Sequence, residues 1–229
     1  MAEQTLTFDF AFQTALSHGS RVFTLDAAVR TPARRLAILG PSGSGKSLTL
    51  QLLAGLMRPQ RGHVFIAGQC YGDTAQNIWL PPQQRRAGLL FQDYALFPHL
   101  TVAQNIAFGL HQGLFSPSRR RARLEAVLEW LDKMQLDTVA DHYPSQISGG
   151  QRQRTALART CITSPSWLLL DEPFSALDTA LRAQMRGHTA ALQRELGIPL
   201  LLITHDPEDA KALADETAVI ENGRLRHGC

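Results

Sequence analysis

The segment whose chemistry is clearest is a glycine-rich loop at residues 40–47. Its sequence, Gly-Pro-Ser-Gly-Ser-Gly-Lys-Ser, fits the pattern G-x-x-x-x-G-K-[ST] at every fixed position. Glycines let successive backbone N–H groups turn inward as an anion-binding nest, and a following helix N-terminus adds partial positive charge. Lys46 can reach the β- and γ-phosphate oxygens of a nucleotide, and the Ser47 hydroxyl can ligate Mg²⁺. The pattern predicts a phosphate site made of Gly40, Pro41, Ser42, Gly43, Ser44, Gly45, Lys46 and Ser47.

The elements on either side of this loop favour the same interpretation. Residues 35–39 form an apolar run typical of a buried strand, and residues 48–56 contain few helix breakers. The alternative is an ordinary Gly/Ser loop, which needs neither a strand before it nor a helix after it. The strand-loop-helix context therefore favours phosphate binding.

Two adjacent acids form a second chemical feature. Phosphoryl transfer with Mg²⁺ needs an acid at the end of a strand beside the phosphate loop. Asp171 ends the apolar run 167–171 and is placed to hold the metal, directly or through water. Glu172 would project differently, towards the γ-phosphate, and polarise an attacking water as general base. A plain strand-to-turn boundary also explains Asp-Glu-Pro, but the phosphate loop upstream makes that the minor interpretation.

A second glycine-containing loop lies at residues 147–154 and leads into a predicted helix. Ser148 and the amides of Gly149 and Gly150 would make another anion-binding helix N-terminus. One nucleotide does not need two such loops from one chain. We therefore expect this loop to close over a nucleotide held by a second copy.

The N-terminal part of the chain shows the pattern of short strands. Residues 5–12 and 21–29 alternate apolar and polar residues, which predicts paired antiparallel strands. Short strands are also expected at 63–66 and 88–91. Between them, residues 67–85 are rich in Gly, Gln, Asn and Pro and are predicted to form a loop.

The rest of the chain predicts helices followed by a parallel sheet. From about 93 to 159 helical periodicities dominate. Apolar runs at 167–171 and 200–204 then flank a predicted helix at 178–196, and this alternation implies parallel strands with right-handed crossovers. Residues 218–223 indicate a final hairpin.

Composition and charge exclude several classes of protein. The chain is 44% hydrophobic and 19% charged, as in globular proteins, and no window of 18 consecutive apolar residues predicts a membrane span. The N-terminus lacks the basic and apolar regions of a secretory signal. Cys70, Cys161 and Cys229 are far apart and odd in number, which suits neither a disulfide framework nor a zinc site and favours a reducing cytoplasm.

Clustered arginines supply much of the positive charge, although the net charge is only +3. They are Arg119, Arg120, Arg121 and Arg123, then Arg152, Arg154 and Arg159. The first cluster precedes residues expected to share one helical face, Leu124, Val127, Leu128, Leu131 and Met134. We interpret these arginines as a solvated helix face. No aromatic residues interleave with them, so nucleic acid is not an expected partner.

Together these residues closely resemble the nucleotide-binding subunit of an ATP-binding-cassette (ABC) transporter. The resemblance covers about residues 5–226, and six motifs occur in family order. They are the Walker A loop Gly40 to Ser47, the Q-loop Gln92, the signature Ser148-Gly149-Gly150-Gln151, the Walker B acids Asp171 and Glu172, the D-loop Ser175-Ala176-Leu177-Asp178, and the switch histidine His205.

The resemblance implies one ABC ATPase domain over residues 1–229 of the α/β class. Its P-loop NTPase core, about 1–92 and 160–229, would have a mainly parallel sheet and an N-terminal antiparallel β region. A helical signature subdomain would occupy about 93–159. The relatives usually continue into a C-terminal β-rich regulatory domain, whereas this sequence stops at Cys229, so we expect no such domain here.

The resemblance also implies ATP and Mg²⁺ as cofactors and assigns roles to residues. Glu172 would be the catalytic carboxylate, His205 would contact the γ-phosphate, and Gln92 would sense Mg²⁺ and the attacking water. Taken alone, His205 would more commonly be a core or surface histidine. The metal site would comprise Ser47, Gln92 and Asp171.

Two copies would pack head to tail in this family and enclose two ATPs. Each site would combine Walker A of one chain with Ser148, Gly149, Gly150 and Gln151 of the other, and Asp178 would lie at the dimer interface. An adenine-stacking aromatic residue is expected in the first β region, but neither Phe23 nor His18 is assigned to that role.

Residues 91–102 and 105–110 resemble those of binding-protein-dependent importers, and residues 80–86 look most like molybdate-importer ATPases. The resemblance therefore implies an ATPase that powers import of molybdate or a related oxyanion. Sulfate, iron, thiamine and polyamine importers share much of the pattern, an exporter is a further alternative, and a non-transport ABC ATPase is the least favoured.

Implied partners are membrane permease subunits and, indirectly, a periplasmic or extracellular solute-binding protein. The chain would lie peripherally on the cytoplasmic face of the cell membrane. Residues 97–100 would line a groove for a permease helix or simply form a subdomain core.

Overall fold

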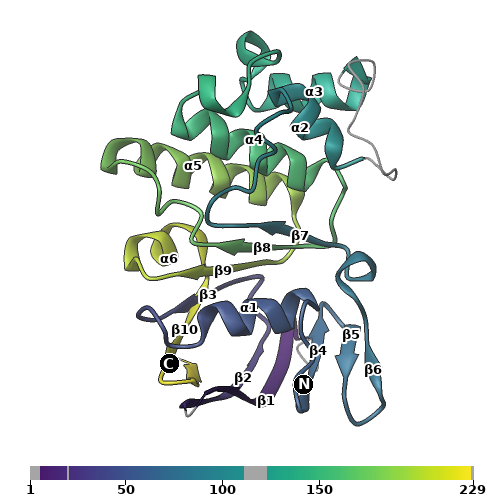
Figure 1. Ribbon diagram of the computed structural model, residues 1–229, viewed down its shortest axis with the longest axis vertical. Helices are drawn as coiled ribbons and strands as arrows, with labels where there is room; N and C mark the ends of the chain where they lie inside the picture. Colours follow the sequence, from purple (N-terminus) through teal and green to yellow (C-terminus); the bar gives the residue numbers. More distant parts are fainter. Residues whose placement is uncertain (1–5, 20, 111–122, 228–229) are drawn as a thin grey trace. The chain divides into compact units, whose positions relative to one another are not determined.

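The computed structural model describes residues 6–19, 21–110 and 123–227 (Figure 1). These residues form two compact units. The first, which we call the sheet unit, comprises described residues 6–87, 166–172 and 186–227. The second, the helical unit, comprises described residues 88–165 and 173–185.

Four parallel strands form the centre of the sheet unit. They run in the order β10 (Glu216–Glu221), β3 (Arg35–Leu39), β9 (Leu200–Thr204) and β8 (Trp167–Asp171). Every residue of β9 is buried, as is all of β8 except Asp171. Continuous apolar runs of this kind are expected where both faces of a parallel sheet are covered. This arrangement confirms the predicted parallel strands at 167–171 and 200–204.

An antiparallel region continues the same sheet. It contains β1 (Phe8–His18), β2 (Arg21–Thr31), β4 (Arg61–Ile66), β5 (Gln69–Asp73) and β6 (Ile78–Trp79), in the order β6-β5-β4-β1-β2. Phe8 pairs with Thr31 and His18 with Arg21, so the predicted N-terminal pair is confirmed and extends further than expected. The side chains of Phe8, Phe10 and Phe12 are fully buried because alternate residues of β1 face the core.

The C-terminal hairpin joins these two regions. β11 (Arg224–His227) pairs antiparallel with β10 and parallel with β2, where Arg224 lies opposite Asp26. Asn222 and Gly223 form its two-residue turn with φ values of 49° and 75°, as an Asn-Gly hairpin turn requires. The predicted α/β class is confirmed, and the sheet is mixed.

The predicted loop at 67–85 is wrong. It contains β5, β6 and a short 3₁₀ helix at Pro82–Gln84. The polar residues and short lengths of these strands hide the alternation of apolar and polar residues that would predict a strand. The backbone at Gly72 packs closely on Trp79, since a Cβ there would lie 2.4 Å from the indole ring. This glycine therefore marks close packing in the sheet rather than a loop.

Three α-helices contribute described residues to the sheet unit: α1 (Lys46–Ala54), α6 (Pro207–Leu213) and α5 (Thr179–Leu196) from residue 186 onwards. α1 packs near β8, and α6 packs near β3 and β9. The predicted helix at 48–56 is shifted, because Gly55 with φ of 77° ends α1 and its N–H bonds back to Leu52. Leu56 therefore lies outside the helix and is exposed.

The helical unit contains most of β7 (Ala87–Leu90), then α2 (Val102–Phe108), α3 (Glu125–Lys133), α4 (Gly149–Cys161) and the first part of α5. Short 3₁₀ helices occur at Asp137–Val139 and Pro144–Gln146. α2 packs against both α3 and α4.

The predicted apolar face before and along α3 is only partly correct. Val127, Leu131 and Met134 are buried, whereas Leu124 and Leu128 are exposed. Leu124 precedes the helix, and Leu128 lies roughly 100° around it from Val127. Arg119, Arg120 and Arg121 lie outside the described residues. In the described part of the chain, no helix combines the length and apolar character that crossing a membrane requires.

Candidate nucleotide site

The phosphate loop connects β3 to α1, as the sequence predicts. Gly45 precedes the helix with φ of 111°, and Gly43 also has a positive φ. These left-handed conformations favour glycine because a Cβ would crowd the backbone. The nest therefore has the backbone conformation that turns N–H groups inward.

Lys46 lies folded over this loop. Its side chain is largely buried, and Nζ donates to the carbonyl oxygens of Gly40 at 2.6 Å and Pro41 at 3.0 Å. The Oε1 atom of Glu172 lies 3.7 Å from the same nitrogen. The ammonium thus lies within the loop, where phosphate oxygens could replace the two neutral carbonyl acceptors.

The C-terminal hairpin braces the phosphate loop from outside. The Gly223 N–H donates to the Ser44 carbonyl at 2.9 Å, and the Gly223 carbonyl accepts from the Asp26 N–H at 2.7 Å. A Cβ at Gly40 would lie 2.4 Å from the Ile220 carbonyl oxygen. The sequence analysis missed this brace because it joins residues far apart in the chain.

The two acids after β8 have different surroundings. The pKa of Asp171 is raised to about 6, mainly by burial and secondly by the negative charge of Glu172, and Lys46 offsets part of this rise. The Glu172 N–H donates to the Ile203 carbonyl at 2.8 Å, and its φ of 47° turns the chain away from the strand. A left-handed glutamate is uncommon and marks a position where the fold directs the side chain specifically.

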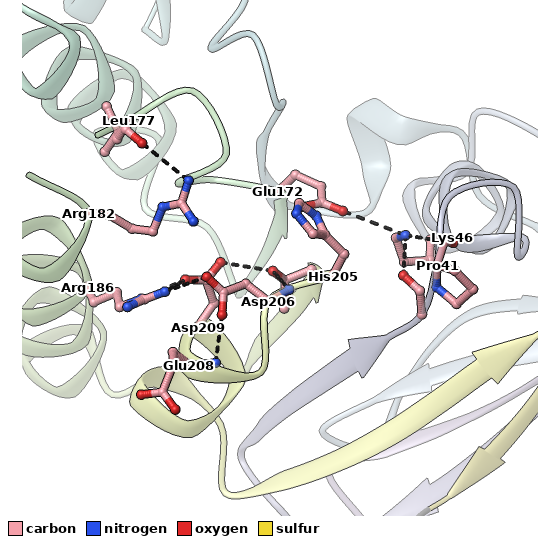
Figure 2. Close-up of polar contacts among 12 residues, drawn as sticks. Pro41, Lys46, Glu172, Leu177, Arg182, Arg186, His205, Asp206, Glu208 and Asp209 are labelled. Atoms are coloured by element: carbon pink, nitrogen blue, oxygen red, sulfur yellow. Dashed lines mark hydrogen bonds and ion pairs between the residues drawn. The ribbon is translucent and has the colours of Figure 1, made fainter. Parts of the chain in front are cut away.

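Glu172 lies between Lys46 and His205 (Figure 2). Its Oε2 is 2.5 Å from His205 Nδ1, and its other oxygen faces Lys46. His205 follows β9 directly, and its side chain is 56% exposed. The structure therefore brings together three residues, Lys46, Glu172 and His205, that the sequence analysis assigned to one reaction centre.

The Q-loop residue Gln92 belongs to the helical unit, where it is exposed just after β7. The loop that follows is fixed by Arg159, which donates to the carbonyls of Tyr94 at 2.6 Å and Ala95 at 2.7 Å. Buried Asn105 holds the next part through hydrogen bonds to Phe97 and the Leu100 carbonyl. Leu100 is buried, whereas Pro98 and His99 are exposed, so only part of the segment 97–100 contributes to the core of this unit.

The signature residues begin α4 in the helical unit. Ser148 caps the helix by accepting from the Gln151 N–H, and the Gln151 side chain accepts from the Ser148 N–H. The D-loop carboxylate of Asp178 accepts from the Leu181 N–H at 3.0 Å and thereby caps α5. Both segments thus begin helices through side-chain caps.

Neither Phe23 nor His18 is assigned to adenine stacking by the structure. The Phe23 ring edge lies against the phosphate loop, 3.1 Å from where a Cβ on Gly45 would be. The His18 side chain lies outside what the structure describes.

The residues present fit a magnesium nucleotide. The Ser44 hydroxyl is buried in the loop without a hydrogen-bond partner, beside a nest of positive-φ glycines and an ammonium group. Among the described residues, no group of three or more His, Cys, Asp or Glu side chains could hold a metal ion. A Mg²⁺ ion that takes several of its ligands from phosphates and water needs no such group.

Comparison with known proteins shows the family to which this chain is similar. The model of the ABC transporter family matches residues 29–175. A probable sulfate/thiosulfate import ATP-binding protein of Chlorella vulgaris is 45% identical over 190 residues, 83% of this chain and 77% of the relative. A spermidine/putrescine import ATP-binding protein of Frankia alni is 44% identical over 204 residues, 89% of this chain but 42% of the relative. An Fe(3+) ions import ATP-binding protein of Pseudomonas fluorescens is 46% identical over 202 residues, 87% and 55% of the two chains. The chain thus spans about half the length of the last two relatives.

A solved structure shows the same fold. It is a dimeric ATP-binding cassette in a post-hydrolysis state bound to ADP and Pi, with a TM-score of 0.75 and 28% identity over 95% of this chain and 96% of the other. The chain therefore belongs to the ABC transporter family, as an ATPase that uses ATP and Mg²⁺.

Proposed function

We propose that this chain is the ATP-hydrolysing subunit of an ABC importer. The observation that carries the proposal is the placement of Glu172 between Lys46 and His205. Relatives named as import ATP-binding proteins, at 44–46% identity, support the direction of transport. The proposal also treats residues 1–229 as one ABC ATPase domain, with a helical signature subdomain at about 93–159.

Each residue near the phosphate loop has a proposed task. Lys46 and the loop amides bind the β- and γ-phosphates, while Ser47, Asp171 and Gln92 hold the metal directly or through water. Bound Mg²⁺ supplies neutralisation of the charge that develops on the phosphate oxygens. Glu172 accepts a proton from the attacking water, and His205 orients Glu172 and contacts the γ-phosphate.

A second copy completes the site in this proposal. Residues 148–151 of one chain would cover the nucleotide held by the Walker A loop of the other, with Asp178 at the interface. The solved dimeric cassette supports a pairing of this kind. ATP binding would close the dimer, hydrolysis would reopen it, and the helical subdomain would transmit both changes to membrane permease subunits. The chain would then be a peripheral subunit at the cytoplasmic face.

The transported solute is proposed to be molybdate or a related oxyanion such as sulfate. Residues 80–86 favour molybdate by resemblance, and the sulfate/thiosulfate relatives support the oxyanion class. A solute-binding protein outside the membrane would be an indirect partner. Iron, thiamine and polyamine importers, and an exporter, remain as alternatives for the transport assay.

The first experiment replaces the proposed base. We expect Glu172→Gln to bind ATP with affinity close to wild type but to lose about 100-fold or more in turnover, because general-base catalysis contributes that much. ATPase rates and equilibrium nucleotide binding measure the two effects, and Glu129→Gln on the exposed side of α3 is the matched control. Undiminished turnover in Glu172→Gln would remove Glu172 from this role.

The second experiment tests transport. Cells lacking this protein would be supplied with wild type or Glu172→Gln and given labelled molybdate or sulfate. Uptake restored by wild type alone would establish import of that oxyanion. If uptake of both anions does not depend on the protein, the proposed ATPase role stands but the oxyanion is wrong. The assay would then be repeated with labelled iron, polyamines and thiamine, and after these for export.

A further inference from the structure

We propose that Arg186 is a positioning residue for His205. It would act through two aspartates that fix the backbone on both sides of the histidine. This inference rests on the proposed roles of Glu172 and His205 in hydrolysis. No motif in the sequence points to Arg186, because it lies inside a predicted helix without a recognisable pattern around it.

The guanidinium of Arg186 binds two aspartates at once (Figure 2). Its Nε donates to Asp209 Oδ1 at 2.6 Å, and its Nη2 donates to Asp206 Oδ2 at 2.7 Å. Nη2 also lies 2.5 Å from Asp209 Oδ1. The planar fork of an arginine suits this double contact, whereas a lysine ammonium has no such fixed geometry.

Both neighbours of His205 in the chain belong to this network. Asp206 follows the histidine and uses its second oxygen to cap α6, accepting from the Glu208 N–H at 2.9 Å. Thr204 precedes the histidine, and its hydroxyl donates to Asp209 Oδ2 at 2.9 Å. The same hydroxyl accepts from the Asp206 N–H at 3.1 Å. Residues 204 and 206 are thus fixed to one another and, through the aspartates, to Arg186.

This network lies where charge pairs are well shielded from water. The side chain of Asp209 is only 4% exposed, and those of Arg186 and Asp206 are 17% and 21% exposed. Solvent screening weakens the electrostatic attraction of charge pairs in such surroundings less than it weakens that of surface pairs. The ring of His205 is by contrast 56% exposed, so packing around the ring restricts it less than this anchored backbone does.

The geometry therefore links α5 to the reaction centre within one unit. Arg186 fixes Asp206 and Asp209, these fix the backbone at His205, and the His205 ring meets Glu172. A shift of about 1 Å in such a chain of contacts can cost about 100-fold in rate. A purely structural role, in which Arg186 only attaches α5 to α6, would lower stability without acting through His205.

The test uses the full chain and separates these two roles. Arg186→Met removes the charge but keeps the length of the side chain, and Arg186→Lys keeps the charge without the fork. Arg35→Met is the matched control, because Arg35 also pairs with an aspartate, Asp215, through Nε at 3.0 Å. We expect Arg186→Met to lower kcat about 10- to 100-fold with KM for ATP nearly unchanged. The kcat of Arg186→Lys should lie between those of wild type and Arg186→Met, and Arg35→Met should keep the wild-type kcat.

A double-mutant cycle and a spectroscopic signal supply two measurements that would not change if Arg186 had only a structural role. In a His205→Ala background, Arg186→Met should change kcat no further, because its effect passes through the histidine. In nucleotide-free protein, the His205 imidazole nitrogen signals, assigned with His205→Ala, should shift or broaden in Arg186→Met and stay unchanged in Arg35→Met.

The outcomes separate this inference from the proposed function. If Glu172→Gln or His205→Ala keeps full ATPase activity, the proposed function fails. If both residues are required but Arg186→Met leaves kcat and the His205 signals at wild-type values, only the positioning role is overturned. An Arg186→Met effect that persists undiminished in the His205→Ala background also overturns it. Urea unfolding of each variant confirms that folded protein is being compared.

Discussion

At the scale of single residues, the site depends on two adjacent carboxylates with different surroundings. Asp171 still belongs to buried β8, whereas Glu172 has already left the strand through a left-handed backbone turn. That turn directs Glu172 towards Lys46 and His205. The backbone turn at a single residue therefore separates the acid that we propose holds the metal from the acid that we propose accepts the proton.

The raised pKa of Asp171 predicts a pH dependence of stability in metal-free protein. Its pKa is about 6 in the folded chain, against an ordinary value of 3.8 for a solvated aspartate, so the folded state holds the proton more tightly. As the pH rises from about 4 to about 6, the unfolded chain has already lost the proton, and the folded state loses stability relative to it.

Asp171→Asn cannot ionise, so its advantage over wild type should grow through this pH range and then remain constant. Urea unfolding in the presence of a chelator, at pH values from about 4 to about 7.5, measures the difference. The same difference at every pH would show that Asp171 does not titrate as expected.

Lys46 should contribute strongly to nucleotide affinity. Its two closest acceptors are neutral carbonyls, so phosphate oxygens would form stronger, charge-assisted bonds with it. We expect Lys46→Ala to weaken ATP binding about tenfold or more, which corresponds to about 1.4 kcal/mol. Calorimetry measures the affinity, and Lys133→Ala, whose ammonium stacks on Trp130 in the helical unit, should bind as wild type does. Equal affinity in the two variants would contradict the phosphate-loop assignment.

At the scale of elements, the phosphate loop depends on a hairpin from the other end of the chain. Its turn residue Gly223 bonds to Ser44 and packs so closely on β2 that a Cβ would lie 1.9 Å from the Thr24 carbonyl oxygen. β10–β11 therefore contributes to the shape of the loop as well as to the sheet.

Gly223→Ala should disturb the phosphate loop without changing any of the loop's own residues. The added methyl group cannot avoid the Thr24 carbonyl, so we expect a loss of about 3 kcal/mol in unfolding free energy and roughly tenfold weaker ATP binding. Gly187→Ala is the matched control, since it lies in α5 with open space around it and should stabilise the chain by about 1 kcal/mol. Chemical unfolding and calorimetry measure both effects. Normal ATP affinity in a correctly folded Gly223→Ala protein would refute the bracing role.

The sequence predicts those elements whose signal is local. The pattern that predicts the phosphate loop lies within eight consecutive residues. The apolar runs of β8 and β9 predict strands because both faces of the sheet are covered there. β5 and β6 were missed because their apolar contacts, such as Gly72 with Trp79, replace alternation with close packing. The Arg186 network and the Gly223 brace were missed because each forms only when distant segments meet.

At the scale of the whole molecule, the proposed site residues are divided between two units. The phosphate loop, the two acids and His205 belong to the sheet unit, and Gln92 and residues 148–151 belong to the helical unit. Only α5 among the helices contributes residues to both units in the described part of the chain. A site assembled from two copies would explain why one chain carries two anion-binding loops.

Head-to-tail pairing predicts that two inactive variants restore activity when mixed. Lys46→Ala damages the loop of its own chain, and Ser148→Arg damages the signature that it would lend to a partner. A mixed dimer has one site with both segments intact. We expect the equimolar mixture to recover about a quarter of the wild-type ATPase rate, since about half of the dimers are mixed and each has one intact site of two.

ATPase rates of each variant alone and of the mixture, across a range of protein concentrations, test this prediction. Two copies of the same variant give the baseline. A mixture no more active than the sum of its parts would contradict a site shared between chains.

The backbone turn at Glu172 also has a consequence for laboratory evolution of this protein. A glycine there would relieve a left-handed conformation that costs a side-chain-bearing residue about 1 kcal/mol, while removing the carboxylate. A selection for heat resistance alone would therefore enrich sequences that lack the proposed general base, since stability and the proposed activity favour different residues at this position. Any improved cassette must be selected for turnover and durability together.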